Sequence, residues 1–265
     1  MNDFHPDPRY PQAETLAAIS DNLADVNRRI ADACARAGRD PRAVRLLPVS
    51  KTRDVSRIRL AYAAGCRFLG ENKVQEALGK WEALQDLADL RWSIIGHLQT
   101  NKARYVARFA SEFQALDSVR VAEELDRRLQ REGRALDVFI QVNTSGEESK
   151  YGLQPDAVAA FLKNLPAFSS LHIVGLMTLA IFSSDVPRVR ACFVSLRELR
   201  DRLRDDAPAH VGLDELSMGM SGDFEIAVEE GATVVRVGQA IFGARDVPDS
   251  HYWPKTGGGA PSSVD

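Results

Sequence analysis

Eight short runs rich in β-branched and aromatic residues alternate with amphipathic stretches along most of the chain. The runs are typical of strands, and the stretches between them of helices, because their apolar residues recur every three or four positions. Parallel strands need crossover connections, which helices usually supply. Eight such units in 265 residues predict an α/β fold, a single closed (β/α)8 barrel of the TIM type.

The expected elements follow one another with short connections. Strands are expected over residues 44–50, 67–70, 92–95, 112–116, 138–143, 172–177, 213–217 and 233–237. The connecting helices are expected over 55–64, 74–87, 101–109, 119–130, 157–165, 186–203 and 224–230. An extra helix over 13–37 precedes the barrel. An open, doubly wound sheet is the less favoured alternative, because the turn at 50–53 lacks the glycines that usually follow the first strand of such sheets.

The two ends of the chain lack these patterns. Residues 1–12 are polar and rich in proline, so we expect a flexible N-terminal segment there. The barrel is expected over 13–247, without a second domain. Residues 248–265 are rich in glycine, serine and proline and predict a disordered tail.

Composition narrows the functional classes. The apolar fraction of 45% can fill a large core, and the net charge of -3 argues against a nucleic-acid-binding surface. No stretch approaches the roughly 18 continuous apolar residues of a membrane span, and the N-terminus lacks a signal-peptide pattern. Three widely separated cysteines without metal-ligand spacing indicate reduced thiols. We therefore expect a cytoplasmic protein without a bound metal, nucleic acid or membrane.

Lys51 ends the first expected strand, and in a barrel the functional groups follow the C-terminal ends of strands. In a partly desolvated pocket the pKa of a lysine falls, and the neutral amine then attacks aldehydes to form a Schiff base. The alternative is a lysine whose stem leaves the strand while its ammonium group reaches water.

A loop of serine and glycine, residues 217–223, follows the seventh strand, and Arg236 and Gly238 lie at the end of the eighth. Such a loop offers backbone N–H groups, hydroxyls and a positive helix end to an anion, and Arg236 adds a forked donor suited to phosphate. The alternative is an ordinary helix-entry turn capped by Asp223. Barrels often bind phosphate after strands seven and eight, which favours the phosphate site.

Three other polar residues have two interpretations each. His97 is either a general base or a loop hydrogen-bonding residue. Glu71 either tunes a nearby amine or pairs with Lys73 or Lys102. Lys150 lies in a polar loop, where a solvated charge is the default.

An aldehyde-reactive lysine and a phosphate-binding loop at one barrel mouth predict a ligand that carries both an aldehyde and a phosphate. Pyridoxal 5′-phosphate has an aldehyde and a phosphate. The phosphosugar substrate of a Schiff-base aldolase satisfies the same pair, so the residues by themselves leave both ligands open.

Several motifs, in this order, resemble those of the pyridoxal phosphate homeostasis proteins. The motifs are VSKT at 49–52, GEN at 70–72, VQE at 74–76, IGHLQTNK at 95–102, GLMT at 175–178, SMGMSGD at 217–223 and RVG at 236–238. The resemblance extends from the first helix to about residue 245 and implies a barrel related to the N-terminal domain of alanine racemase.

The resemblance also implies roles for individual residues. Pyridoxal phosphate would be held as an internal aldimine on Lys51, Asn72 and Met218 would line the pocket, and Lys150 would be a secondary acceptor of the cofactor. The phosphate-binding residues of the family match Ser217, Gly219, Ser221, Arg236 and Gly238 of this chain. Lys73 is a departure, because the family often has tyrosine there.

The function implied is to hold, buffer or deliver pyridoxal phosphate, supporting vitamin B6 and amino- and keto-acid homeostasis without a catalytic cycle. A racemase of this fold needs a second base, a tyrosine from an appended domain in a dimer, and none of the five tyrosines directly ends an expected strand. We therefore expect a monomer that contacts apo-enzymes transiently. A racemase-like amino-acid enzyme is the main alternative, and the aldolase is a more distant one.

Overall fold

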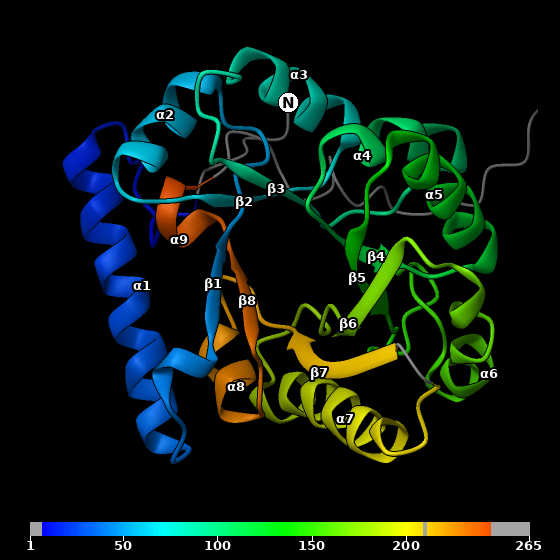
Figure 1. Ribbon diagram of the computed structural model, residues 1–265. Helices are drawn as coiled ribbons and strands as arrows, with labels where there is room; N and C mark the ends of the chain where they lie inside the picture. Colours follow the sequence, from blue (N-terminus) through cyan, green and yellow to red (C-terminus); the bar gives the residue numbers. More distant parts are fainter. Residues whose placement is uncertain (1–6, 209–210, 245–265) are drawn as a thin grey trace, which may run out of the picture.

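The strands of the computed structural model form a single parallel sheet in the order β1-β8-β7-β6-β5-β4-β3-β2 (Figure 1). A parallel bridge between Val49 and Gly70 joins β1 to β2, so that the ring closes. The structure describes residues 7–208 and 211–244, and the helices surround the ring of strands (Figure 1). The predicted (β/α)8 barrel is confirmed.

The strands are β1 Arg45–Pro48, β2 Phe68–Glu71, β3 Arg91–Ile94, β4 Glu112–Leu116, β5 Leu136–Gln141, β6 Leu171–Met177, β7 Val211–Ser217 and β8 Val234–Val237. The α-helices are α1 Leu16–Arg36, α2 Val55–Ala63, α3 Val74–Ala83, α4 Ala103–Phe109, α5 Val119–Glu132, α6 Val158–Leu162, α7 Val186–Arg204, α8 Phe224–Glu229 and α9 Gln239–Phe242. Short 3-10 turns are η1 Pro41–Ala43, η2 Thr100–Lys102, η3 Pro155–Ala157 and η4 Leu165–Ala167.

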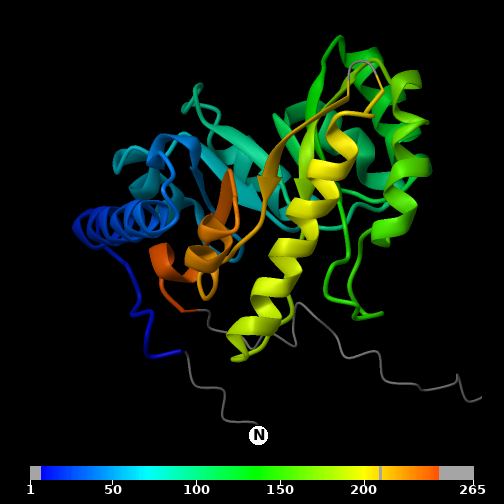
Figure 2. The same cartoon turned by 90° about the horizontal axis from the view of Figure 1, so that it is seen from below.

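The N-terminal helix expected over 13–37 is present as α1. The side chain of Thr15 accepts a hydrogen bond from the N–H of Ala18 and begins this helix. Helix α1 packs against α2, α8 and α9 on the outside of the barrel, with α9 beside it in Figure 2. It therefore covers the side of the ring where the chain both enters and leaves the barrel.

Two expectations about helices are wrong. The single helix expected over 157–165 is divided: η3 ends at Ala157, α6 ends at Leu162, and η4 begins at Leu165, where Pro166 disfavours the α-helical conformation of the residue before it. The short helix α9, directly after β8, was not predicted. Its four residues are too few to show a helical period in the sequence.

The expected N-terminal segment 1–12 is described only from residue 7, and the expected tail 248–265 lies outside the described residues. The hydroxyl of Tyr10 donates to the carbonyl of Ser221, and the N–H of Ala244 donates to the carbonyl of Tyr10. These contacts attach the described part of the segment to the loop after β7. In the parts of the chain that the structure describes, every helix is too short or too polar to cross a bilayer.

Gly175 on β6 leaves no room for a side chain, because a Cβ built there lies 2.0 Å from the carbonyl oxygen of Glu215 on β7. We expect Gly175→Ala to lower the free energy of unfolding by about 1–3 kcal/mol, since the backbone of one strand must move. Unfolding in urea measures this loss.

Gly79→Ala is the matched control. Gly79 lies on the exposed side of α3, and a Cβ added there has no atom within 4 Å. The same substitution should raise the free energy of unfolding by up to about 1 kcal/mol, because alanine favours the helix. An equal loss of unfolding free energy in the two variants would contradict a steric clash between β6 and β7 as its cause.

Candidate functional site

Lys51 lies in a hydrogen-bonded turn directly after β1. The backbone N–H of Arg53 donates to the carbonyl of Ser50 at 3.0 Å, which closes a four-residue turn around Lys51 and Thr52. Thr52 has a φ of +67°, the left-handed conformation that a type II turn requires at its third position. Lys51 itself is half-buried, at the end of the barrel where chemistry is expected.

A buried cluster of charges lies against this turn. The ammonium group of Lys80 on α3 donates to the carbonyl of Ser50 at 2.8 Å, to Glu71 at 2.7 Å and to Glu76 at 2.6 Å. The hydroxyl of Ser50 donates to the same Glu71 oxygen at 2.6 Å, and the N–H of Thr52 donates to Glu76 at 2.6 Å. The turn at the end of β1 is therefore attached to α3 and to the end of β2.

Glu71 pairs with Lys80, and not with Lys73 or Lys102 as the second of its two interpretations proposed. Burial raises the pKa of Glu71 to about 7, and this effect exceeds the opposing effect of the Lys80 charge. The second carboxyl oxygen of Glu71 has no hydrogen-bond partner among the described residues. With this pKa, a substantial fraction of the Glu71 carboxyl groups is protonated near neutral pH.

Lys80 was not among the predicted site residues, because a lysine in a helix is usually solvated. The spacing of Lys80 from the apolar residues of the same helix could have indicated its burial. Lys80 comes three residues after Ala77 and six after Val74, both of which are buried, and so lies on the apolar face of α3.

The loop after β7 packs closely against α8 and the end of β8. Gly219 has a φ of +93°, and a Cβ there would lie 2.6 Å from the Cβ of Ala227. The hydroxyl oxygen of Ser221 accepts from the backbone N–H groups of Gly238 and Ala240 at 3.2 and 3.3 Å. Its own proton remains available to an acceptor such as a phosphate oxygen.

Asp223 occupies the position before α8, but it does not cap that helix as the alternative interpretation required. Its carboxylate accepts instead from the backbone N–H of Met220 at 2.5 Å, within the loop. Asp223 therefore stabilises the shape of the loop after β7.

Close approaches bring the predicted residues of different loops together. A Cβ on Gly238 would lie 3.1 Å from the carbonyl oxygen of Val49, so the end of β8 touches the chain just before Lys51. A Cβ on Gly96 would lie 2.2 Å from the carbonyl oxygen of Asn72, so the loops after β2 and β3 also meet. The structure thus places Lys51 near Gly238 and Ser221.

Arg236 and Ser217 lie inside the barrel and bind each other. Arg236 donates to the hydroxyl of Ser217 at 2.6 Å and to the carbonyl of Thr178 at 2.7 Å, while Ser217 donates to Gln114 at 2.6 Å. Burial lowers the pKa of Arg236 to about 10. The guanidinium forms no ion pair within residues 7–208 and 211–244, so it contributes a buried positive charge that favours an anion nearby.

Two other predicted residues are enclosed by protein. Met218 is fully buried in the hydrophobic core. Lys150 donates to the carbonyl of Ala180 at 2.8 Å and pairs with Glu147 at 2.5 Å, with 14% of its side chain exposed. The charge of Lys150 is therefore paired and largely buried, whereas its polar loop suggested a solvated charge.

His97 follows β3 and contacts Asp117, which follows β4, at 3.3 Å. The ring of Tyr151, from the loop after β5, stacks on His97 with centroids 3.9 Å apart. Burial raises the pKa of Asp117 against the effect of His97. His97 is thus held by other loops, as its second interpretation proposed.

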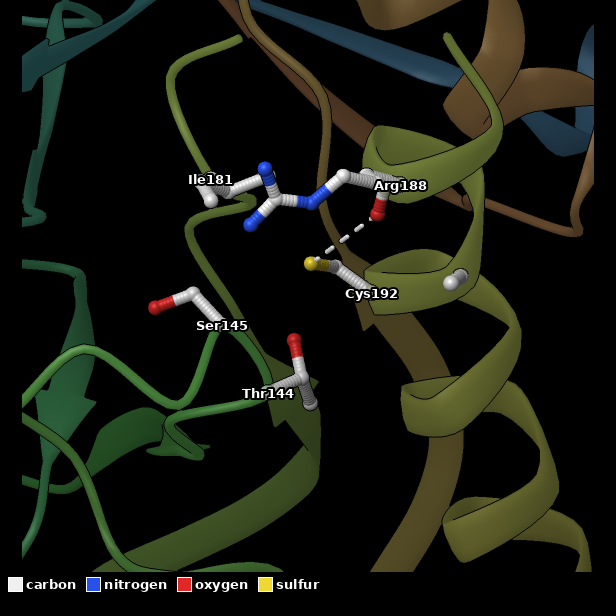
Figure 3. Close-up of a pocket in the computed structure, with 6 residues that line it drawn as sticks. Thr144, Ser145, Ile181, Arg188 and Cys192 are labelled. Atoms are coloured by element: carbon white, nitrogen blue, oxygen red, sulfur yellow. Dashed lines mark hydrogen bonds between the residues drawn. The ribbon is translucent and has the colours of Figure 1, made fainter. Parts of the chain in front are cut away.

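A pocket of about 230 Å³ lies between the loops after β5 and β6 and helix α7 (Figure 3). It is lined by Thr144, Ser145, Ile181, Arg188, Ala191 and Cys192. None of the predicted cofactor residues lines this pocket.

Comparison with known sequences places the chain among named relatives. Residues 16–246 match the family model for the alanine racemase N-terminal domain. The chain is 43% identical over 225 residues to the pyridoxal phosphate homeostasis protein of Aquifex aeolicus, covering 85% of this chain and 97% of that one. It is 42% identical over 231 residues to the protein of that name from Pseudomonas aeruginosa, covering 87% and 97%.

A solved structure provides the third comparison. PipY of Synechococcus elongatus, solved with pyridoxal phosphate bound, superposes on the chain with a TM-score of 0.75. The two sequences are 38% identical, and the match covers 85% of this chain and 100% of PipY.

The raised pKa of Glu71 predicts a pH dependence of stability. Between about pH 4.5 and 7 the folded protein keeps a proton that the unfolded carboxyl releases, so this group stabilises the fold at low pH and loses that contribution as pH rises through about 7. We expect Glu71→Gln to flatten this fall, by up to about 1.4 kcal/mol per pH unit. Urea unfolding of both proteins at several pH values measures the difference, and parallel profiles would contradict it.

Proposed function

The chain belongs to the pyridoxal phosphate homeostasis proteins, and from this premise we propose that it binds pyridoxal 5′-phosphate covalently through Lys51. The observation that carries the proposal is the position of Lys51, in a turn held by hydrogen bonds and beside the loops that contain Ser221 and Gly238. The PLP-bound structure of PipY supports this choice of ligand.

Lys51 supplies the nucleophile. Its neutral amine adds to the aldehyde carbon, a C–N bond forms, and the aldehyde oxygen leaves as water. Release reverses the step and consumes one water. The bound group supplies an aldehyde that reacts reversibly, which storage and delivery both require.

The phosphate would lie in the loops after β7 and β8. Ser221 can donate its hydroxyl proton, while Gly219 and Gly238 let the two loops pack closely on α8 and on the end of β1, which sets the position of this hydroxyl. Ser217 and Arg236 are occupied with each other, so we propose that they act through the buried positive charge of Arg236. Asn72 would lie at the pocket rim, where it contacts the loop after β3.

We further propose that the protein buffers or delivers the cofactor without turning over a substrate. The relatives carry the name of homeostasis proteins, and a carrier needs only a reversible bond and recognition of the phosphate. Delivery would involve transient contact with apo-enzymes, and Lys150 would be a second acceptor once it separates from Glu147.

Lys51→Ala tests the covalent bond. Borohydride reduction of the wild-type protein with pyridoxal phosphate should give one pyridoxyl adduct on Lys51, located by peptide mass spectrometry. In Lys51→Ala this adduct and the visible absorption of the bound cofactor should both disappear, because the amine is absent.

Lys163→Ala is the control, since Lys163 is an exposed lysine after α6. It should leave the adduct unchanged. A wild-type protein that forms no adduct would overturn the proposed function, and an adduct found only on Lys150 would overturn the assignment to Lys51. Sustained racemisation of amino acids by the loaded protein, lost in Lys51→Ala, would establish the racemase alternative instead.

A further inference from the structure

The turn that carries Lys51 adopts a backbone conformation that its own sequence disfavours. Thr52, with a φ of +67°, is the one residue other than glycine in the left-handed region over residues 7–208 and 211–244. Left-handed backbone is especially unfavourable for β-branched residues. Such conformations persist where the surrounding contacts impose them, and they concentrate at functional sites.

The contacts that impose this conformation act on both peptide groups next to Lys51. The carbonyl of Ser50, in the peptide before Lys51, accepts from Lys80 at 2.8 Å. The N–H of Thr52, in the peptide after Lys51, donates to Glu76 at 2.6 Å. Because Lys80 also pairs with that Glu76 oxygen at 2.6 Å, one ammonium group holds both peptides, the first directly and the second through Glu76.

Lys80 is buried with all of its hydrogen-bonding capacity used. Its three N–H donors match three acceptors, on Ser50, Glu71 and Glu76, and only 8% of its side chain is exposed. Buried ion pairs can often be replaced by apolar residues without loss of stability. The burial of Lys80 is therefore better explained by the turn that it holds than by a contribution to stability.

We propose that Lys80 is a positioning residue for Lys51. Its ammonium group holds the turn at 50–53 in the conformation that presents the Lys51 amine to the aldehyde of the ligand. Lys80 itself forms no bond to the ligand. The inference rests on the proposed function of Lys51 and extends it to a residue of α3.

Two ligands separate this role from a general effect on the fold. Pyridoxal 5′-phosphate can bond to Lys51, whereas pyridoxine 5′-phosphate has the same ring and phosphate with an alcohol in place of the aldehyde. We expect Lys80→Met to weaken the binding of the first ligand on the order of 10-fold, the usual scale for losing a charged hydrogen bond. The second ligand should lose less than about 2-fold, because it does not use Lys51.

Arg134→Met is the matched control. Arg134 precedes β5 and donates to the carbonyls of Ala107 and Ala110, so it is also a cation that holds backbone carbonyls. It lies toward the N-terminal ends of the strands, away from Lys51. Its removal should lower stability while leaving the ratio of the two affinities unchanged.

A second substitution tests the mechanism of positioning. Glycine readily adopts a positive φ, so Thr52→Gly added to Lys80→Met should recover a large part of the lost affinity for pyridoxal phosphate. A role of Lys80 in electrostatics or stability would not respond in this way. If Lys80→Met does not fold, Glu76→Ala replaces it, since Glu76 is partly exposed and holds the N–H of Thr52.

The outcomes distinguish the two proposals. If the wild-type protein binds both ligands with equal affinity and forms no adduct, the proposed function fails. If the wild-type protein forms the adduct but the variant weakens both ligands equally, or neither, the positioning role of Lys80 is overturned. Selective loss of pyridoxal phosphate that is recovered by Thr52→Gly supports it.

Discussion

The parallel pairing of β1 with β8 is the contact on which the site depends, because it joins the first strand of the barrel to the last; a bridge between Val49 and Gly70 completes the ring on the other side of β1. In a closed parallel barrel the C-terminal ends of all strands lie at one mouth. Lys51 and the loop 217–223 are far apart in the sequence, yet they become neighbours for this reason. The close approach of Gly238 to Val49 is the direct evidence.

Charges buried near this mouth hold loops in place. Lys80 binds the turn after β1, and Arg236 connects β8 to β7 through Ser217 and to the end of β6 through the carbonyl of Thr178. Burying an ion costs desolvation free energy unless hydrogen bonds and opposite charges compensate for the lost water. The Lys80 ammonium and both terminal nitrogens of Arg236 have such partners, which gives the loops defined positions.

Local periodicity predicted most elements well and failed where the pattern was short or interrupted. The strand expected over 112–116 is β4 to the residue, and all five of its residues are buried, the polar Glu112 and Gln114 included. The four-residue helix α9 and the broken helix around Pro166 were missed, since neither contains enough turns to establish a period.

The partners of charged residues were the least predictable feature. Glu71 binds Lys80, and Asp223 binds the backbone of Met220, although the sequence suggested other roles for both. Lys73 is the lysine nearest to Glu71 in the sequence, yet Lys80, nine residues away, is its partner, because the choice depends on which helix face packs against the strand ends. Only the packing of α3 against β2 and β3 decides it.

The sequence by itself determined the barrel and the family and singled out Lys51 as the candidate nucleophile, because these depend on hydrophobic period and on motifs that lie within a few residues. The tertiary structure decided which groups hold Lys51 in place. That decision needs the left-handed Thr52, the buried Lys80 and the carbonyl of Ser50 at hydrogen-bonding distance. Distances of this kind arise only when the ring closes and the helices pack against it.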